Sequence, residues 1–333
     1  MLEPLYDLSV MIPARDAEDT LYDTLVSIIQ NIPRKISYEI LVADHCSTDG
    51  TAEQYQQFED LVGNGDYTGN EPEVISIIEV GPEVKTVAGV RNRLAHLAEG
   101  HQFLFLDSDT ELTPAWKAQA VEYIGTAREM DAVSSIPLLP SHGWKVSWIW
   151  QNWFRYFAYG RYDHLRKPRS GYLAGAHTLV HRDVFYGVGG FNEALVTGED
   201  VDFSARVRAV GMRVVIDHRM AVIHHGYPKT VQGFFVRESW HGMGDWQTAT
   251  QFLRSKVAQV AAVEWVLMTL AFVCLTWRAP DWASLFLAGA VAVPVTMSFY
   301  KFKDLNLVAR IRNAAACWLY LSARGFSLFR KEP

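Results

Sequence analysis

The chain has 333 residues, more than a typical single domain, which allows one α/β domain with an additional part. Its formal net charge of -6 argues against a general nucleic-acid-binding protein, because such proteins need a basic surface. Its three cysteines, Cys46, Cys274 and Cys317, are far apart and form no CxxC or Cys/His pattern, so neither a disulfide framework nor a structural zinc site is predicted.

The first part of the chain alternates short apolar runs with helical patterns. The runs predict strands at residues 8–12, 38–43, 75–80, 103–106 and 212–223, and the patterns predict helices at residues 17–29 and 87–98. This alternation predicts an α/β fold with a Rossmann-like, mostly parallel sheet and helices on both of its faces. Ligands of such sheets bind at the carboxyl ends of the strands, so polar clusters that follow the strands are candidate sites.

Two aspartates, Asp107 and Asp109, directly follow a strongly apolar predicted strand. Carboxylates one residue apart at a sheet edge repel each other unless a cation lies between them, and Mg²⁺ or Mn²⁺ suits such oxygen ligands. One interpretation is therefore a metal site. The alternative is a helix N-cap, because Asp and Thr ahead of Pro114 are good helix-starting residues. A DxD pattern taken alone favours that alternative.

Three further polar clusters are candidates for chemistry. Asp44 follows a buried strand and could accept a hydrogen bond from a nucleotide base, while the Ser-Thr-Asp-Gly sequence behind it is typical of a turn. Glu199 and Asp200 belong to a run of acids that is more often a solvated surface, but that could supply a general base. His224 lies at the end of a predicted strand, where its imidazole could complete a metal shell or contact a diphosphate.

Taken together and in this order, the motifs resemble those of the inverting family-2 glycosyltransferases of the GT-A fold. The resemblance rests on an opening strand at residues 10–15, a DDGSTDGT-like turn at 44–51, the helix residues 89–92, the DxD of 107–109, and GGFDE-like and GED-like stretches at 189–193 and 198–202. His45 and Cys46 stand where the family usually has Asp and Gly, which leaves details of base recognition open.

The resemblance implies a nucleotide diphosphate-sugar donor. Mg²⁺ or Mn²⁺ would be held by Asp107 and Asp109, and His224, from its place at a strand end, is a candidate for a further ligand. Asp200, with Glu199 beside it, would be the catalytic base that deprotonates the acceptor hydroxyl. The implied nucleotide-binding residues are Pro13, Ala14, Arg15, Asp44, Arg91, Asp107 and Ser108.

Three residues further along the chain are candidates for contacting the acceptor or the diphosphate. Arg237, Trp240 and His241 lie roughly where processive relatives carry a QxxRW motif, which this sequence does not match. Addition of a single sugar is therefore expected.

Two segments near the C-terminus, residues 257–277 and 282–300, are almost free of charge and long enough to cross a membrane. With aromatic residues at their ends, they predict a transmembrane hairpin. The alternative is a pair of buried helices in a soluble domain. Glu264 is awkward in the first segment, because a carboxylate in lipid must be protonated, paired or near a boundary.

Lysine and arginine residues flank the predicted hairpin mainly on one side, and no secretory signal is recognised at the N-terminus. The catalytic part is therefore expected on the cytoplasmic face of the inner membrane. The expected domains are a GT-A domain at 1–230, an amphipathic connector at 231–256, the hairpin at 257–304 and a C-terminal helix at 305–333. That helix could be a third span, but its arginines favour the membrane interface.

An aromatic segment at residues 144–162, bounded by arginines, gives one aromatic helical face. Such a face is more often core, but beside a membrane anchor it also suits a lipid headgroup region. We therefore expect a lipid-linked acceptor, such as a polyprenyl phosphate or a glycan on polyprenyl diphosphate, for cell-surface polysaccharide or glycoconjugate synthesis.

Two alternative functions stay open. A nucleotidyltransferase would use a similar scaffold, although no glycine-rich, basic loop follows the first strand. The other alternative is an inactive relative that acts as a membrane assembly partner. The clustered acids argue against it, because clustered carboxylates without a function would cost folding free energy.

Overall fold

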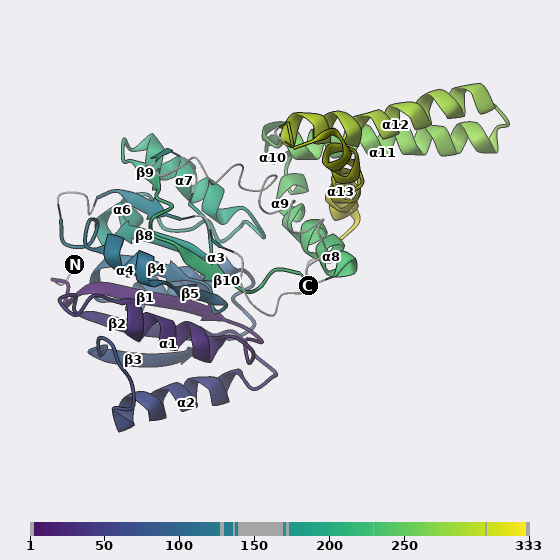
Figure 1. Ribbon diagram of the computed structural model, residues 1–333. Coiled ribbons are helices and arrows are strands. Elements are labelled where there is room, and N and C mark those ends of the chain that lie inside the picture. The colour runs from purple at the N-terminus through teal and green to yellow at the C-terminus, as the bar shows by residue number, and fades with distance from the viewer. Residues whose placement is uncertain are drawn as a thin grey trace. The chain divides into compact units, whose positions relative to one another are not determined.

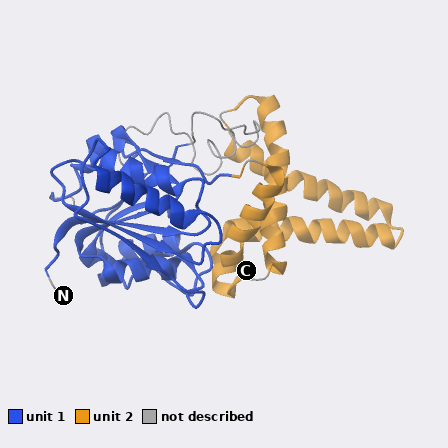
Figure 2. Ribbon diagram, turned by 90° about the horizontal axis from the view of Figure 1, so that it is seen from below, with its two compact units in different colours: residues 1–142, 163–227 blue, residues 143–162, 228–333 orange. Residues whose placement is uncertain are grey.

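The computed structural model (Figure 1) describes residues 3–126, 130–135, 137–138, 169–170, 173–228, 230–303 and 305–330. The described residues divide into two compact units, one ending at Tyr227 and the other beginning at Pro228 (Figure 2). The aromatic segment expected at residues 144–162 lies outside the described residues.

The first unit contains an eight-stranded sheet in the order β3-β2-β1-β4-β8-β6-β9-β7. Strands β1 to β4 pair in parallel, as do β6 and β9, whereas β8 is antiparallel to β4 and β6, and β7 is antiparallel to β9. The predicted mostly parallel sheet is therefore confirmed. The strands are β1 (Tyr6–Ala14), β2 (Tyr38–Asp44), β3 (Val74–Glu79), β4 (Gly100–Leu106), β6 (Ala132–Ser134), β7 (Arg169–Ser170), β8 (His177–His181) and β9 (Val214–Ile216).

A hydrophobic core covers each face of this sheet. Along β4, Leu104 and Leu106 belong to the core that includes α1, α2 and α4, while Phe103 and Phe105 belong to the core that includes α3, α6 and α7. This alternation follows from the two-residue period of a strand, and it confirms the expected helices on both faces. The helices are α1 (Leu21–Asn31), α2 (Thr51–Asn64), α3 (Val87–Leu97), α4 (Pro114–Ala120), α6 (Arg182–Gly187) and α7 (Glu199–Ala209).

The single strand expected at residues 212–223 is wrong. The segment forms β9 in the large sheet and β10 (Val222–His224), which pairs antiparallel with β5 (Thr110–Leu112) in a separate ribbon. The break comes at Asp217, a fully buried carboxylate that accepts hydrogen bonds from the Tyr123 hydroxyl at 2.7 Å and from the Arg219 backbone N–H at 3.0 Å. An Asp that binds the backbone two residues ahead forms a turn and ends the strand.

The second unit is helical. Its long helices α11 and α12 run side by side as a hairpin, and α13 packs against both (Figures 1 and 2). Arg324 joins α13 to the preceding helices, because its guanidinium lies 3.0 Å from Glu238 on α8 and 3.3 Å from Asp245 on α9. The helices are α8 (Val231–His241), α9 (Met243–Trp246), α10 (Ala249–Arg254), α11 (Lys256–Thr276), α12 (Pro280–Lys301) and α13 (Leu307–Phe326).

Candidate active site

The predicted metal residues Asp107, Asp109 and His224 come together in the first unit. Asp107 and Asp109 follow β4, and the β5–β10 ribbon places His224 opposite Thr110. His224 Nε2 lies 3.3 Å from Asp109 Oδ1 and 3.9 Å from Asp107 Oδ2. The helix N-cap alternative is confirmed for the threonine but is wrong for the aspartates, since α4 is capped by Thr113, whose hydroxyl accepts from the Trp116 N–H at 3.3 Å.

The chemistry and spacing of these three side chains fit a divalent cation. One ligand atom from each lies within 4.8 Å of the others, and two carboxylates with one imidazole form a common ligand set for Mn²⁺ and related ions. The backbone also approaches closely, because a Cβ added at Gly226 would overlap the Asp109 carboxylate. A larger residue at position 226 would therefore displace a candidate ligand.

Arg91 on α3 connects the metal residues to the acidic start of α7. Its guanidinium is 3% exposed, and it donates at 2.7 Å to Asp107 Oδ1 and at 2.7 Å to Glu199 Oε1. The same group donates at 3.0 Å to the carbonyl oxygen of Gly175. One buried cation thus neutralises carboxylates that lie 92 positions apart in the chain, from Asp107 to Glu199.

Asp200 lies in the same network, at the N-terminus of α7. Its carboxylate accepts from the Val201 N–H at 2.7 Å and from the Gly175 N–H at 3.1 Å. Burial raises the pKa of Asp200 to about 7, and the negative charge of Glu199 adds to the rise, while the two N–H groups and Arg91 oppose it. A carboxyl with a pKa near neutrality is suited to accept a proton at physiological pH.

A short clamp holds α3 in place. Asn92 Nδ2 donates to the carbonyl of Phe191 and its Oδ1 accepts from the Phe191 N–H, both at 2.9 Å. Gly190 makes this approach possible, because it has a φ of 68° and a Cβ there would lie 2.9 Å from Asn92 Oδ1. The Phe191 ring in turn lies under the Arg91 guanidinium at 5.7 Å. The GGFNE stretch therefore orients the helix that carries Arg91.

The residues expected at the nucleotide lie at the ends of β1 and β2. Ala14 pairs with Asp44 and Pro13 with Ala43, so the two strands end at the same level. Asp44 Oδ1 accepts from the Ser47 N–H at 3.0 Å, so part of this carboxylate stabilises its own turn.

The two other residues expected at the nucleotide differ in how firmly they are held. Arg15 is exposed. Ser108 is fixed through its carbonyl oxygen, which accepts from the Thr24 hydroxyl at 3.0 Å.

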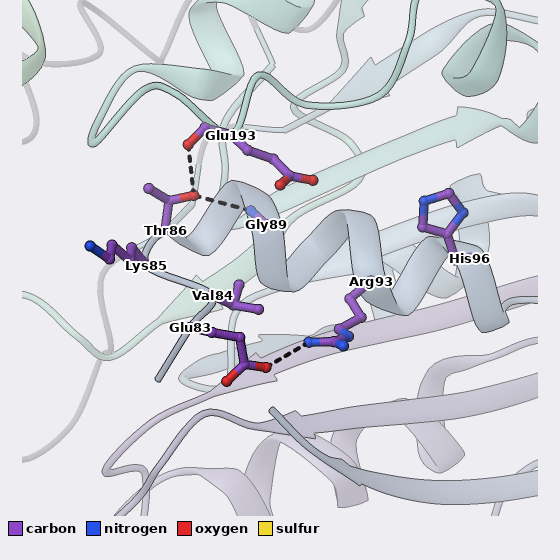
Figure 3. Close-up of a pocket in the computed structure, with 8 residues that line it drawn as sticks. All are labelled: Glu83, Val84, Lys85, Thr86, Gly89, Arg93, His96 and Glu193. Atoms are coloured by element: carbon purple, nitrogen blue, oxygen red, sulfur yellow. Dashed lines mark hydrogen bonds and ion pairs between the residues drawn. The ribbon is translucent and has the colours of Figure 1, made fainter. Parts of the chain in front are cut away.

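A polar pocket of about 420 Å³ lies beside α3 (Figure 3). Acidic and basic side chains both line the pocket, and among them Arg93 forms an ion pair with Glu83 at 3.1 Å. None of the predicted site residues lines this pocket, so the candidate site is defined by the carboxylate cluster. The pocket is lined by Glu83, Val84, Lys85, Thr86, Gly89, Arg93, His96 and Glu193.

Sequence reasoning missed two residues of the site. Gly175 contributes both its N–H and its carbonyl, and a Cβ there would lie 3.3 Å from Arg91 and 3.6 Å from Asp200. Asn92 was part of a recognised motif but had no predicted role. A glycine between two alanines was the only sequence signal at Gly175, and it does not identify a partner.

The remaining candidates, Arg237, Trp240 and His241, lie on α8 in the second unit. There Arg237 Nε donates to His241 Nε2 at 3.2 Å, and the Trp240 and His241 rings lie 5.0 Å apart. Their roles toward a diphosphate or an acceptor stay predictions.

We expect Arg91→Met to reduce the free energy of unfolding by about 3–5 kcal/mol, because it leaves the buried Glu199 and the neighbouring Asp107 without their shared cation. The matched control is Arg93→Met on the same helix, which removes only an exposed ion pair with Glu83 and should change stability little. Denaturant unfolding of the full-length protein measures both. Equal stabilities of the two variants would contradict the network.

Several known proteins are similar to this chain. O-antigen biosynthesis protein RfbC from Myxococcus xanthus is 26% identical over 234 residues, which cover 66% of this chain and 17% of the relative. Putative teichuronic acid biosynthesis glycosyltransferase TuaG from Bacillus subtilis is 32% identical over 116 residues, 34% of this chain and 39% of the relative. The matches thus span well under half the length of both relatives.

One similar solved structure is that of mannosyltransferase PcManGT from Pyrobaculum calidifontis in complex with GDP-Man and Mn²⁺. Its TM-score to this protein is 0.61 at 17% sequence identity, and the match covers 99% of this chain and 89% of that chain. This likeness confirms the expected GT-A fold. Residues 9–189, more than half of the chain, match the family described as Glycosyl transferase family 2. The protein therefore belongs to glycosyl transferase family 2.

Proposed function

We propose that this protein is a metal-dependent, inverting glycosyltransferase that transfers one sugar from a nucleotide diphosphate-sugar to an acceptor in polysaccharide synthesis. The observation that carries the proposal is that Arg91 brings the candidate metal ligand Asp107 and the acids Glu199 and Asp200 to one place. Support comes from the relatives, whose names refer to O-antigen and teichuronic acid synthesis, and from the PcManGT complex with GDP-Man and Mn²⁺.

Each group has a distinct role in the proposed reaction. A divalent cation held by Asp107, Asp109 and His224 would offset negative charge on the diphosphate as it leaves. Asp200 accepts the proton of the acceptor hydroxyl while the hydroxyl oxygen forms a bond to the anomeric carbon. The bond from that carbon to the diphosphate oxygen breaks on the opposite side, so the configuration inverts. Arg91 holds the carboxylate of Asp107, on the donor side, close to that of Glu199, on the side of the base.

We further propose that the ends of β1 and β2 bind the nucleoside. Asp44 uses Oδ1 to accept from the Ser47 N–H. Its other carboxylate oxygen, Oδ2, is suited to accept a hydrogen bond from an N–H group of a nucleotide base. Pro13 and Ala14 end the adjacent strand at the same level, Arg15 follows them, and Ser108 follows strand β4, which supports a role for all four beside a nucleotide.

Asp109→Asn should lower Mn²⁺ affinity and abolish most sugar transfer, since it removes one anionic ligand. The test is calorimetric Mn²⁺ binding, together with release of nucleoside diphosphate from UDP-, GDP- and dTDP-sugars with and without chelator. The control Asp60→Asn changes an exposed carboxylate on α2 and should match the wild type.

The same assay separates the alternative functions. Pyrophosphate release from a nucleoside triphosphate would identify a nucleotidyltransferase, and no turnover with any donor would identify an inactive relative. Undiminished transfer by the Asp109→Asn variant would overturn the metal assignment.

The decrease of kcat/KM toward acidic pH should follow the protonation of Asp200. Because its pKa is raised to about 7, the carboxylate is protonated and inactive as a base at lower pH, so kcat/KM should rise as pH increases through about 7. Asp200→Asn should lose both this decrease and most of the activity. Asp202→Asn, which alters a neighbouring carboxylate paired with Arg206, should keep the decrease. A flat profile in the wild type would exclude Asp200 as the base.

We also propose that the second unit anchors the protein in the cytoplasmic membrane, with the catalytic unit on the cytoplasmic face. Helices Lys256–Thr276 and Pro280–Lys301 are long and apolar enough to span a bilayer, and only 22% of the apolar window of each is buried inside the protein. A core helix of a soluble protein would be mostly buried, so lipid is the better match for these surfaces.

Helix α13 is proposed to lie in the membrane interface. It presents the exposed side chains of Val308, Ile311, Trp318 and Phe326 at helical spacing, while Arg312 is exposed near its start. A surface of this kind suits the boundary between headgroups and acyl chains.

A lipid-linked acceptor follows from this placement. We expect transfer to a polyprenyl phosphate or polyprenyl-diphosphate glycan in vesicles to exceed transfer to the matching water-soluble glycan, because the anchor holds the enzyme at the lipid surface. Arg237→Ala should reduce the lipid-acceptor rate if α8 contacts the acceptor. Efficient transfer to soluble glycan, with none to lipid, would contradict the acceptor assignment.

A further inference from the structure

A second pocket of the first unit has no role in the proposed sugar transfer. Its volume is about 640 Å³, and it lies where the end of α1, the start of α4 and the β5–β10 ribbon meet the loop ahead of β3. Most of its lining residues carry polar or charged side chains. Ligand pockets in proteins commonly have volumes of about 300–1,000 Å³, so the space is sufficient for a small polar ligand.

The walls of this pocket are fastened to one another. The Ile29 carbonyl near the end of α1 accepts from the Asn70 N–H at 2.7 Å, and a Cβ added at Gly69 would overlap that carbonyl. On the other side, the Leu112 N–H of β5 donates to the Ser27 hydroxyl at 3.0 Å. The loop and the ribbon are thus both held against α1, and the pocket between them is preformed.

Asn31 supplies a hydrogen-bond acceptor at this pocket. The residue is 7% exposed, and its Nδ2 donates to the carbonyls of Ser27 at 2.9 Å and Leu112 at 3.2 Å. Both hydrogens of the amide are therefore used, which fixes its orientation. Its Oδ1 accepts no hydrogen bond from any residue that the structure describes, although buried polar groups nearly always have a partner. A ligand hydroxyl that donates to Oδ1 would complete the set.

Two basic side chains and one acidic side chain line the same pocket. Lys117 Nζ donates to the Gln30 carbonyl at 2.8 Å, which leaves two of its three hydrogens available. Neither Lys117 nor Arg34 forms an ion pair with a carboxylate in the described part of the chain. The acid, Glu111, instead lies 2.6 Å from the ring of His225. The lining therefore has an excess of positive charge, and an anionic group is the matching ligand.

We propose that this pocket binds an acidic saccharide, a sugar unit that carries a carboxylate or a phosphate. Arg34 and Lys117 bind the anionic group, while Asn31 Oδ1 accepts from a sugar hydroxyl. An apolar ligand would leave these polar groups without partners, at a cost in binding free energy.

The pocket is distinct from the candidate active site. Glu111 and Ile223 line it and pair with each other across the ribbon, and the next pair along is Thr110 with His224. Successive side chains of a strand point to opposite faces of it. The pocket therefore lies beside a candidate metal ligand but on the other face of the ribbon, and the proposed site does not depend on sugar transfer.

Ligand binding without any sugar donor tests this site. The full-length protein in neutral detergent micelles is titrated calorimetrically with a panel of disaccharides that contain a uronic acid and with sugar phosphates. The matching neutral sugars and inorganic phosphate are titrated in parallel. We expect at least one acidic saccharide to bind about tenfold more tightly than its neutral counterpart and than inorganic phosphate, because hydrogen bonds to charged groups add to those of the hydroxyls.

The variants are Arg34→Met and Lys117→Met, combined in one protein, with Lys35→Met as the control. Lys35 is an exposed lysine next to Arg34 that does not line the pocket. The double variant should weaken binding of the acidic saccharide about tenfold or more, since both cationic donors are lost, whereas the control should keep the wild-type affinity.

Four results would overturn the proposal. They are no binding of any acidic saccharide, equal binding of the neutral sugars, equal binding of inorganic phosphate, which would indicate an anion site without sugar recognition, and unchanged affinity in the double variant. Because no donor is present and no transfer is measured, each of these results would leave the proposed function untouched.

Discussion

The ion pairs of the Arg91 guanidinium with Asp107 and Glu199 are the interaction on which the candidate site depends. Without this buried cation, acids from the end of β4 and from the start of α7 would repel each other. With it, they lie within one hydrogen-bonded network that also fixes Asp200 through Gly175.

Three other features of the first unit position the groups around that guanidinium. The parallel strands end at one edge, the Asn92 clamp fixes α3 to the GGFNE stretch, and the β5–β10 ribbon carries His224 to the aspartates. Two of the hydrogen bonds of Asn92 are made to the backbone of Phe191, so they restrict the movement of helix α3. Such rigid support is what a site needs to hold metal, donor and base in fixed geometry.

Much of this arrangement could be predicted from the sequence, because hydrophobic periodicity and motif order are local signals. They predicted the parallel sheet, which the structure confirms, and they singled out Asp107, Asp109 and Asp200, whose roles stay predictions. They did not separate β9 from β10, since that break depends on Tyr123 and other residues distant in the chain meeting Asp217. Arg91 was expected only at the nucleotide, because an ion pair with residues far away leaves no local pattern. Glu264 was recognised as anomalous, but its burial among the packed helices of the second unit became visible only in the structure.

A double-mutant cycle measures directly whether Arg91 couples the two groups of acids. Asp107→Asn and Glu199→Gln are combined in the wild type and in the Arg91→Met background, and the unfolding free energies are compared. The coupling between the two substitutions should differ by more than about 0.5 kcal/mol between the two backgrounds, because only the repulsion between the two carboxylates remains without the guanidinium. Equal couplings in the two backgrounds would contradict a role of Arg91 in joining the acids.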